Sequence, residues 1–133
     1  MLTALEPSQP RWHYAKTRTA LTESLMIARH WRGWTKLEDA DAYESLLRSK
    51  VLPALQQIEG YRGGYILRHL GPSECEFVVI NLFDSLEAVR RFAGEDYAVP
   101  VFEPEALQLL SKVDPVATHY EVRVSPKGVV EIK

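Results

Sequence analysis

The chain has 133 residues, of which 46% are hydrophobic and 26% charged, and its formal net charge is −2. These values fit one soluble globular domain and argue against binding nucleic acid or an anionic membrane, which needs clustered positive charge. One cysteine, Cys75, excludes an internal disulfide, and no apolar run approaches the about 20 residues of a membrane span. Without the charged-then-apolar pattern of a secretory signal, a cytoplasmic location is expected.

Residues 1–23 are interpreted as a tail, because they contain two prolines and show no sustained hydrophobic period. The folded domain is expected to span 24–133. Its first strand is predicted at 24–32, where apolar residues dominate, and Gly33 is expected to end it.

A helix is predicted next. Thr35 followed by Glu38 has the spacing of a capping box, and apolar positions recur with helical period over 40–58. Pro53 removes a backbone donor, so a kink or a stop and restart is expected there. Gly60 ends the element.

Two strands and a second helix follow. Strands are predicted at 61–69 and 75–83, with a Gly-Pro turn between them. Asp84 and Glu87 repeat the capping-box spacing at the start of the second helix, and Gly94 ends it.

The last part is expected to hold a short helix that begins at Pro104 and contains Leu107 and Leu110. A fourth strand is predicted at 116–124, and a short fifth strand at 129–133. The order predicts an α+β fold, a ferredoxin-like βαββαβ antiparallel sheet with the helices on one face.

The third strand predicts how the sheet is covered. A strand with one solvent-exposed face alternates polar and apolar residues, whereas the third predicted strand is apolar on both faces. The residues concerned are Phe77, Val78, Val79, Ile80, Leu82 and Phe83. Helices cover only one face, so we expect a homodimer through the other face; the alternative is that the tail covers it.

Four strings of the sequence stand out: 28–33 (Ala-Arg-His-Trp-Arg-Gly), 83–88 (Phe-Asp-Ser-Leu-Glu-Ala), 92–96 (Phe-Ala-Gly-Glu-Asp) and 119–122 (His-Tyr-Glu-Val). Together with the order of elements, they resemble the antibiotic biosynthesis monooxygenase superfamily of dimeric α/β barrels. The likeness runs over most of the chain. It implies a dimeric α/β barrel with a pocket in each subunit between sheet and helices.

Members of this superfamily differ in activity. Some oxygenate phenolic polyketides without metal or flavin, some degrade haem, and many have no known activity. The haem-degrading members use an Asn on strand one, a Trp at the end of strand three and a His on the following helix. Here Phe83 stands at the second position and no His lies between Asp84 and Pro115, so haem degradation is not expected.

Oxygenation without a cofactor needs a base, because triplet oxygen reacts with an electron-rich anion and not with the closed-shell substrate. His119 and His30 are the candidate bases, since histidine titrates near neutral pH. Asn81, a carboxamide inside an apolar strand, is the candidate for holding a substrate oxygen. The alternative for all three is an ordinary, hydrogen-bonded core role.

Aromatic and basic side chains are candidates for substrate binding: Trp31, Tyr65, Phe92, Tyr97 and Arg29. The aromatic ones are alternatively plain core, and Arg29 alternatively pairs with Glu121 or Glu76. The sequence has no metal-ligand spacing and no glycine-rich phosphate loop, so neither a metal nor a cofactor is expected.

Three functions remain open from the sequence. The first is a cofactor-independent oxygenase acting on a small aromatic substrate, which predicts a closed cavity of a few hundred Å³. The second is a non-catalytic or stress-associated dimer that only binds the ligand. The third is an interaction module with no pocket.

Overall fold

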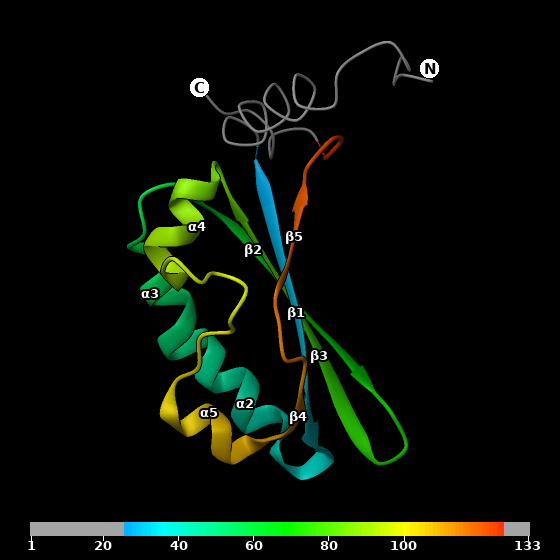
Figure 1. Ribbon diagram of the computed structural model, residues 1–133. Coiled ribbons are helices and arrows are strands. Elements are labelled where there is room, and N and C mark those ends of the chain that lie inside the picture. The colour runs from blue at the N-terminus through cyan, green and yellow to red at the C-terminus, as the bar shows by residue number, and fades with distance from the viewer. Residues whose placement is uncertain (1–25, 127–133) are drawn as a thin grey trace.

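A computed structural model describes residues 26–126, so the predicted tail at 1–23 and the predicted strand at 129–133 lie outside the described residues. Figure 1 shows the order of the elements. The strands are β1 (Ile27–Lys36), β2 (Tyr61–Leu70), β3 (Glu74–Phe83), β4 (Leu110–Val113) and β5 (Thr118–Glu121). The helices are α2 (Ala40–Leu46), α3 (Leu52–Gln56), α4 (Leu86–Ala93) and α5 (Pro104–Leu109), with a 3₁₀ turn at Leu37–Asp39 and a π-helical turn at Leu47–Val51.

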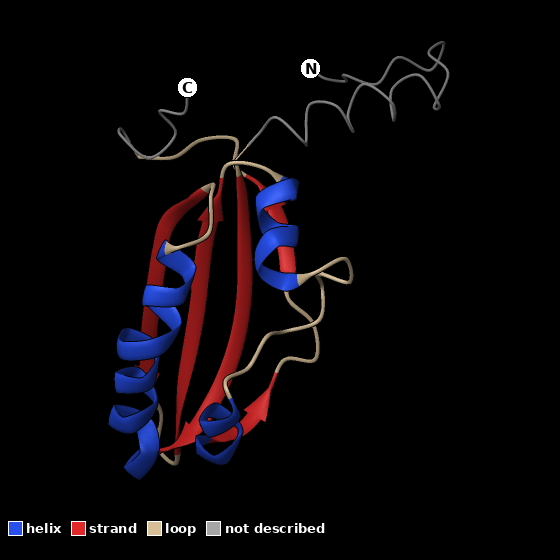
Figure 2. Cartoon of the chain, turned by 90° about the vertical axis from the view of Figure 1, so that its left-hand side faces the viewer, coloured by secondary structure: helices blue, strands red, loops and turns tan. Residues whose placement is uncertain are grey.

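The strands form one antiparallel sheet in the order β2-β3-β1-β4, and β5 also pairs with β1. The helices lie in one layer against one face of this sheet (Figures 1 and 2). The predicted α+β class and the βαββαβ order are confirmed. We refer below to the helix-facing and the helix-free face of the sheet.

The central pair of strands shows how the two faces differ. Alternate residues of β1 are buried on the helix-facing side, and their neighbours are more exposed. The buried positions of β1 lie opposite the buried positions of β3, so that Arg29 pairs with Asn81. Both polar side chains therefore project into the layer between sheet and helices.

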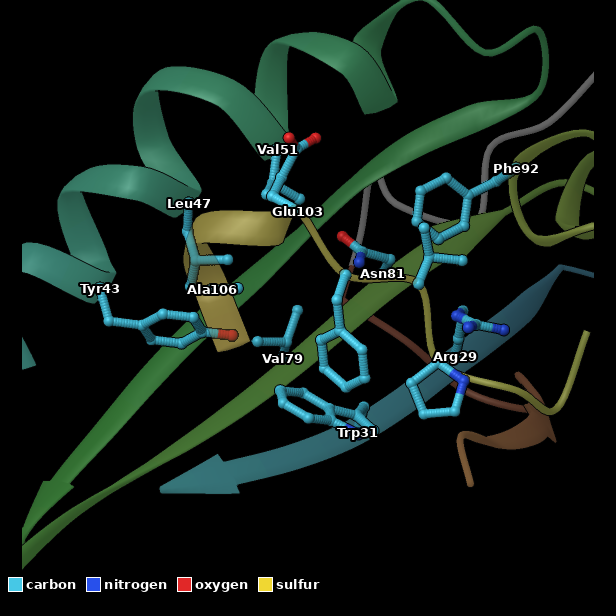
Figure 3. Close-up of a pocket in the computed structure, with 13 residues that line it drawn as sticks. Arg29, Trp31, Tyr43, Leu47, Val51, Val79, Asn81, Phe92, Glu103 and Ala106 are labelled. Atoms are coloured by element: carbon cyan, nitrogen blue, oxygen red, sulfur yellow. The ribbon is translucent and has the colours of Figure 1, made fainter. Parts of the chain in front are cut away.

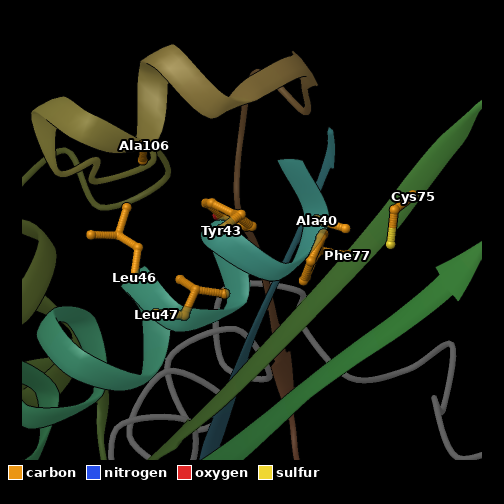
Figure 4. Close-up of a cluster of buried hydrophobic side chains, with 7 residues drawn as sticks. All are labelled: Ala40, Tyr43, Leu46, Leu47, Cys75, Phe77 and Ala106. Atoms are coloured by element: carbon orange, nitrogen blue, oxygen red, sulfur yellow. The ribbon is translucent and has the colours of Figure 1, made fainter. Parts of the chain in front are cut away.

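Two hydrophobic clusters fill this layer. One joins α2 and α5 to the sheet (Figure 4) and consists of Ala40, Tyr43, Leu46, Leu47, Cys75, Phe77 and Ala106. The other joins α3 and α4 to the opposite end of β1 and consists of Ile27, Leu55, Phe83, Ala88 and Val89. The layer thus has two separately packed ends.

The expected end of the first strand at Gly33 is wrong, because β1 continues to Lys36. Gly33 makes room for an aromatic ring. A Cβ atom at this position would lie 2.3 Å from the ring of Trp31. Glycine here lets an indole lie flat along its own strand, and it does not break that strand.

Both predicted capping boxes are wrong in detail. Thr35 is fully buried within β1 and donates a hydrogen bond to the carbonyl of Lys36, so it caps no helix. Ser85, and not Asp84, caps α4: its Oγ accepts from the N–H of Ala88 at 3.1 Å.

The first helix continues past Pro53 through a local change of helix type, which the sequence did not predict. A π-helical turn with a wider backbone spacing comes immediately before the α-helical turn that contains this proline. The extra residue in such a turn relieves the clash between a proline ring and the preceding carbonyl. Leu47 and Val51 at its two ends both reach the layer above the sheet.

The C-terminal part also departs from expectation. Leu110 belongs to β4 and not to the short helix, and β4 itself was not predicted. The predicted strand at 116–124 is restricted to Thr118–Glu121 within the described residues.

Candidate functional site

A cavity lies where the two hydrophobic clusters meet, between the sheet and the helices (Figure 3). Its volume is about 60 Å³. This volume is smaller than the few hundred Å³ predicted above for a cofactor-independent oxygenase. Its lining comes from β1, β3, the first helical segment, α4, α5 and the segment before α5: Arg29, Trp31, Tyr43, Leu47, Val51, Val79, Asn81, Phe92, Pro100, Val101, Phe102, Glu103 and Ala106.

The walls of the cavity are mainly aromatic and aliphatic. Trp31 meets Phe102 edge to face, with ring centroids 5.5 Å apart. The indole N–H of Trp31 donates to the carbonyl of Asp114 at 2.9 Å, which fixes the ring. Such walls suit a flat apolar molecule.

Arg29 is the most unusual group in this lining. Its side chain is buried, and Nη1 donates to the carbonyl of Tyr97, while Nη2 donates to the carbonyl of Val99 at 3.2 Å. The guanidinium also lies 5.5 Å from the ring centroid of Phe92. Burial lowers the pKa of Arg29 to about 10, so it remains charged near neutral pH.

The expected ion pair between Arg29 and Glu121 or Glu76 is wrong. Within residues 26–126, Arg29 has no carboxylate within ion-pair distance. Glu76 lies 3.6 Å from Arg32 instead.

His119 lies behind Arg29, outside the cavity. Its Nε2 is 3.0 Å from Nη1 of Arg29 and accepts that hydrogen bond, which leaves the ring proton on Nδ1. Burial, together with the Arg29 charge, lowers the pKa of His119 to about 4. The imidazole also packs edge to face on Tyr97, at 5.0 Å between ring centroids. His119 is thus neutral at neutral pH and its acceptor nitrogen is occupied.

Asn81 lies in the cavity wall and is 7% exposed. Its Oδ1 accepts from the hydroxyl of Tyr61 at 3.0 Å. Its Nδ2 makes no hydrogen bond to any described residue, and Figure 3 shows that nitrogen turned toward the cavity. The amide is therefore oriented by Tyr61 and keeps a donor for a ligand.

Tyr43 is a cavity residue that sequence reasoning placed only in the apolar stripe of the first helix. It is 3% exposed, and its hydroxyl has no hydrogen-bond partner among the described residues. Figure 3 shows the hydroxyl pointing toward Val79 inside the cavity. Burial raises the pKa of Tyr43, so the group stays a neutral donor. In the sequence, the signal for this cavity position was a polar hydroxyl within an otherwise apolar helical stripe.

The predicted site residues fall into three groups: those that line the cavity, those that contact Arg29 from outside it, and those on the helix-free face of the sheet. Trp31, Arg29, Asn81 and Phe92 line the cavity together. Tyr97 and His119 support Arg29 from outside it.

His30 and Tyr65 do not belong to this site. Both lie on the helix-free face, where they pair with the two sides of Ile80. His30 meets Tyr120 there, with ring centroids 6.2 Å apart. The cavity roles predicted for these two residues are therefore not compatible with their positions.

The segment between α4 and α5 was not predicted to contribute. Pro100, Val101, Phe102 and Glu103 cover the cavity and have no regular secondary structure. Sequence periodicity carries no signal for such a segment.

Two classes of site find no support in the described part of the chain. Residues 26–126 contain no group of three His, Cys, Asp or Glu side chains placed to hold a metal ion. Among the same residues, no helix is long and apolar enough to cross a membrane.

The sheet, its helix layer and the cavity between them define an α+β protein of ferredoxin-like fold. Solved structures share this fold. One is a candidate antibiotic biosynthesis monooxygenase from Bacillus cereus, with a TM-score of 0.53 and 18% identity over 77% of this chain and 97% of that chain. Another is a conserved protein from Methanosarcina mazei Go1, with a TM-score of 0.56 and 15% identity over the same shares. The predicted resemblance is thus confirmed at the level of the fold.

The other comparisons gave no match: no protein-family model fits the chain, and no curated protein is similar to it.

Proposed function

We propose that this protein binds a small aromatic molecule in the cavity between β1, β3 and the helices. The observation that carries the proposal is a largely apolar cavity with two inward-facing donors, Asn81 Nδ2 and the Tyr43 hydroxyl. Both donors face the open space of the cavity and have no hydrogen-bond partner among the described residues, so a ligand that accepts hydrogen bonds satisfies both.

The covering segment must move for such a ligand to enter. A cavity that admits benzene measures about 150 Å³, more than twice the volume found between these walls. Residues 94–103 form the irregular wall, and Arg29 fastens this wall to β1 through the carbonyls of Tyr97 and Val99. Displacing residues 100–103, which follow these two carbonyls and line the cavity, enlarges it without disturbing the hydrogen bonds of Arg29 or the sheet.

Thermal shift against a panel of small phenols, quinones and benzoates tests this proposal. A ligand at a hundredfold its dissociation constant adds about 2.7 kcal/mol of stability. Ala106→Leu fills the cavity and should abolish the shift, whereas Ala117→Leu changes a buried alanine that does not line it. Binding that survives Ala106→Leu contradicts the proposal.

Oxygenation of the bound molecule is the second candidate. Support comes from the fold shared with the candidate monooxygenase from Bacillus cereus and from the donors of Arg29 and Asn81, which suit an oxyanion. In this reaction a substrate CH₂ loses a proton, dioxygen adds to the carbanion, and loss of water leaves a carbonyl. One CH₂ and one O₂ thereby become one C=O and one water.

The proposed base His119 is badly placed for that chemistry. It lies outside the cavity, with its pKa lowered to about 4. A substrate would have to ionise to solvent before or during binding. Oxygen-electrode measurements with each ligand from the thermal-shift panel decide the matter: one O₂ consumed per product supports oxygenation, and binding without consumption leaves a binding protein.

We further propose that a second copy of the chain covers the helix-free face. Tyr65, Leu67 and Tyr120 on this face are each about half exposed, and Val78 and Ile80 lie between them. A contiguous apolar sheet face of this kind is typical of a protein–protein contact, and identical faces form a two-fold pair.

Sedimentation of two leucine variants tests the dimer. Leu67→Asp places a charge on the helix-free face and should give monomers. Leu107→Asp changes a leucine of similar exposure on α5, in the helix layer, and should leave the dimer intact. A wild-type chain that sediments as a monomer contradicts the proposal.

A further inference from the structure

Arg29 is a buried cation for which residues 26–126 provide no anionic partner. Its side chain is 5% exposed, and the described residues bring no carboxylate to it. A buried charge is normally paired, because desolvation of an uncompensated ion is costly. Its partners are two backbone carbonyls, a neutral imidazole and an aromatic face, all of which leave the net charge in place.

The guanidinium also has donors to spare. It carries five N–H groups. Both on Nη1 are engaged, by the carbonyl of Tyr97 and by Nε2 of His119, and one on Nη2 is engaged by the carbonyl of Val99. The second N–H of Nη2 and the N–H of Nε make no hydrogen bond to the described residues. Because Arg29 lines the cavity, a ligand in the cavity reaches the guanidinium that carries these two donors.

The other polar groups in the lining also favour a negatively charged ligand. Asn81 pairs with Arg29 across β1 and β3, so its Nδ2 donor lies on the same side of the sheet. The Tyr43 hydroxyl is a third donor. Glu103 is the one carboxylate in the lining, and Figure 3 shows it apart from Arg29. The pKa of Lys50 is raised mainly by its hydrogen bond to Glu105, and the charge of Glu103 adds to this effect.

We infer that the cavity selects an aromatic anion, an aryl carboxylate or the conjugate base of an acidic phenol or enol. Its charged oxygen pairs with Arg29 and accepts from Nδ2 of Asn81, and its ring lies against Trp31 and Phe102. This inference rests on the proposed binding function and adds the charge of the ligand to it.

Benzoate and benzamide form a matched pair for the test, because they have nearly the same shape and differ in charge. Titration calorimetry on the full chain at neutral pH should give at least a tenfold lower dissociation constant for benzoate. Equal affinities, or tighter binding of benzamide, overturn the inference and leave the binding function standing. Binding of neither probe, with no hit in the aromatic panel, overturns both.

Arginine variants locate the charge preference. Arg29→Gln should bring the two affinities to within about threefold of each other, while Arg29→Lys keeps a preference for benzoate. Arg90→Gln is the control, since Arg90 lies against the ring of Tyr97 but does not line the cavity. A benzoate preference that persists in folded Arg29→Gln contradicts the assignment.

A spectroscopic measurement on the unaltered protein covers the case in which Arg29→Gln does not fold. A nitrophenol changes absorbance when it ionises, so its pKa is read directly when free and when bound. We expect the bound pKa to be lower by at least one unit, because Arg29 favours the phenolate. An unchanged or raised pKa for the bound nitrophenol refutes the inference.

Discussion

The contact between His119 and Arg29 gives a stability that depends on pH. In the folded chain, burial and then the Arg29 charge lower the pKa of His119 from 6.5 to about 4. The unfolded chain therefore takes up a proton at a higher pH than the folded chain does. The contribution of His119 is fully present above pH 6.5 and is lost as the pH falls toward 4.

The size of this loss follows from the two pKa values. The full difference between 6.5 and 4 corresponds to about 3 kcal/mol. His119 is only partly buried, so solvent screens a good part of the effect, and about 1–2 kcal/mol is a realistic expectation. His119→Gln keeps an acceptor for Arg29 but does not titrate.

Urea denaturation at a series of pH values measures the difference. Between pH 6.5 and 4, the unfolding free energy of the unaltered chain should fall by about 1–2 kcal/mol more than that of His119→Gln. Carboxylates titrate in both proteins and cancel in the comparison, provided that chain concentration is fixed. Parallel curves for the two proteins would show that neither burial nor the Arg29 charge lowers the pKa of His119 in the folded chain.

Three further variants test the packing that holds the site. Ser85→Ala removes the N-cap of α4 and should cost about 1 kcal/mol in urea denaturation, whereas Ser45→Ala on the exposed side of α2 should cost little. Gly64→Ala places a Cβ atom 2.2 Å from a carbonyl of β3 and 2.7 Å from Oδ1 of Asn81, so it should cost about 1–3 kcal/mol and weaken ligand binding. Phe77→Ala empties a fully buried site and should cost about 3–5 kcal/mol; a loss below 1 kcal/mol would mean that the cluster around α2 packs loosely.

The sequence predicted those elements whose ends are marked by strong turn residues. β2 and β3 were placed within one residue at most of their ends because Gly60 precedes β2, and Gly71 and Pro72 separate the two strands. β4 has only four residues, two of them polar, and it pairs with β1 across a register shift. So short a strand exists because β1 offers an edge to it, and local sequence carries no such information.

The candidate site was predictable only in part, for a geometric reason. Alternation along β1 shows that Arg29 and His30 point to opposite faces, but it does not show which face the helices cover. The structure places Arg29 under the helices and His30 on the other side. The partners of Arg29 are backbone carbonyls 68 and 70 residues away, and a carbonyl leaves no mark in a sequence.

Arg29 connects the position of the covering segment with the charge inside the cavity. The hydrogen bonds that fasten Tyr97 and Val99 to β1 come from the same guanidinium that faces the ligand. Because two N–H groups remain unused, an anion binds without releasing the carbonyls, and the closed state gains an ion pair that the open state lacks. Charge selectivity then depends on closure: loosening the cover at Phe102 should weaken benzoate binding more than benzamide binding, although Phe102 carries no charge.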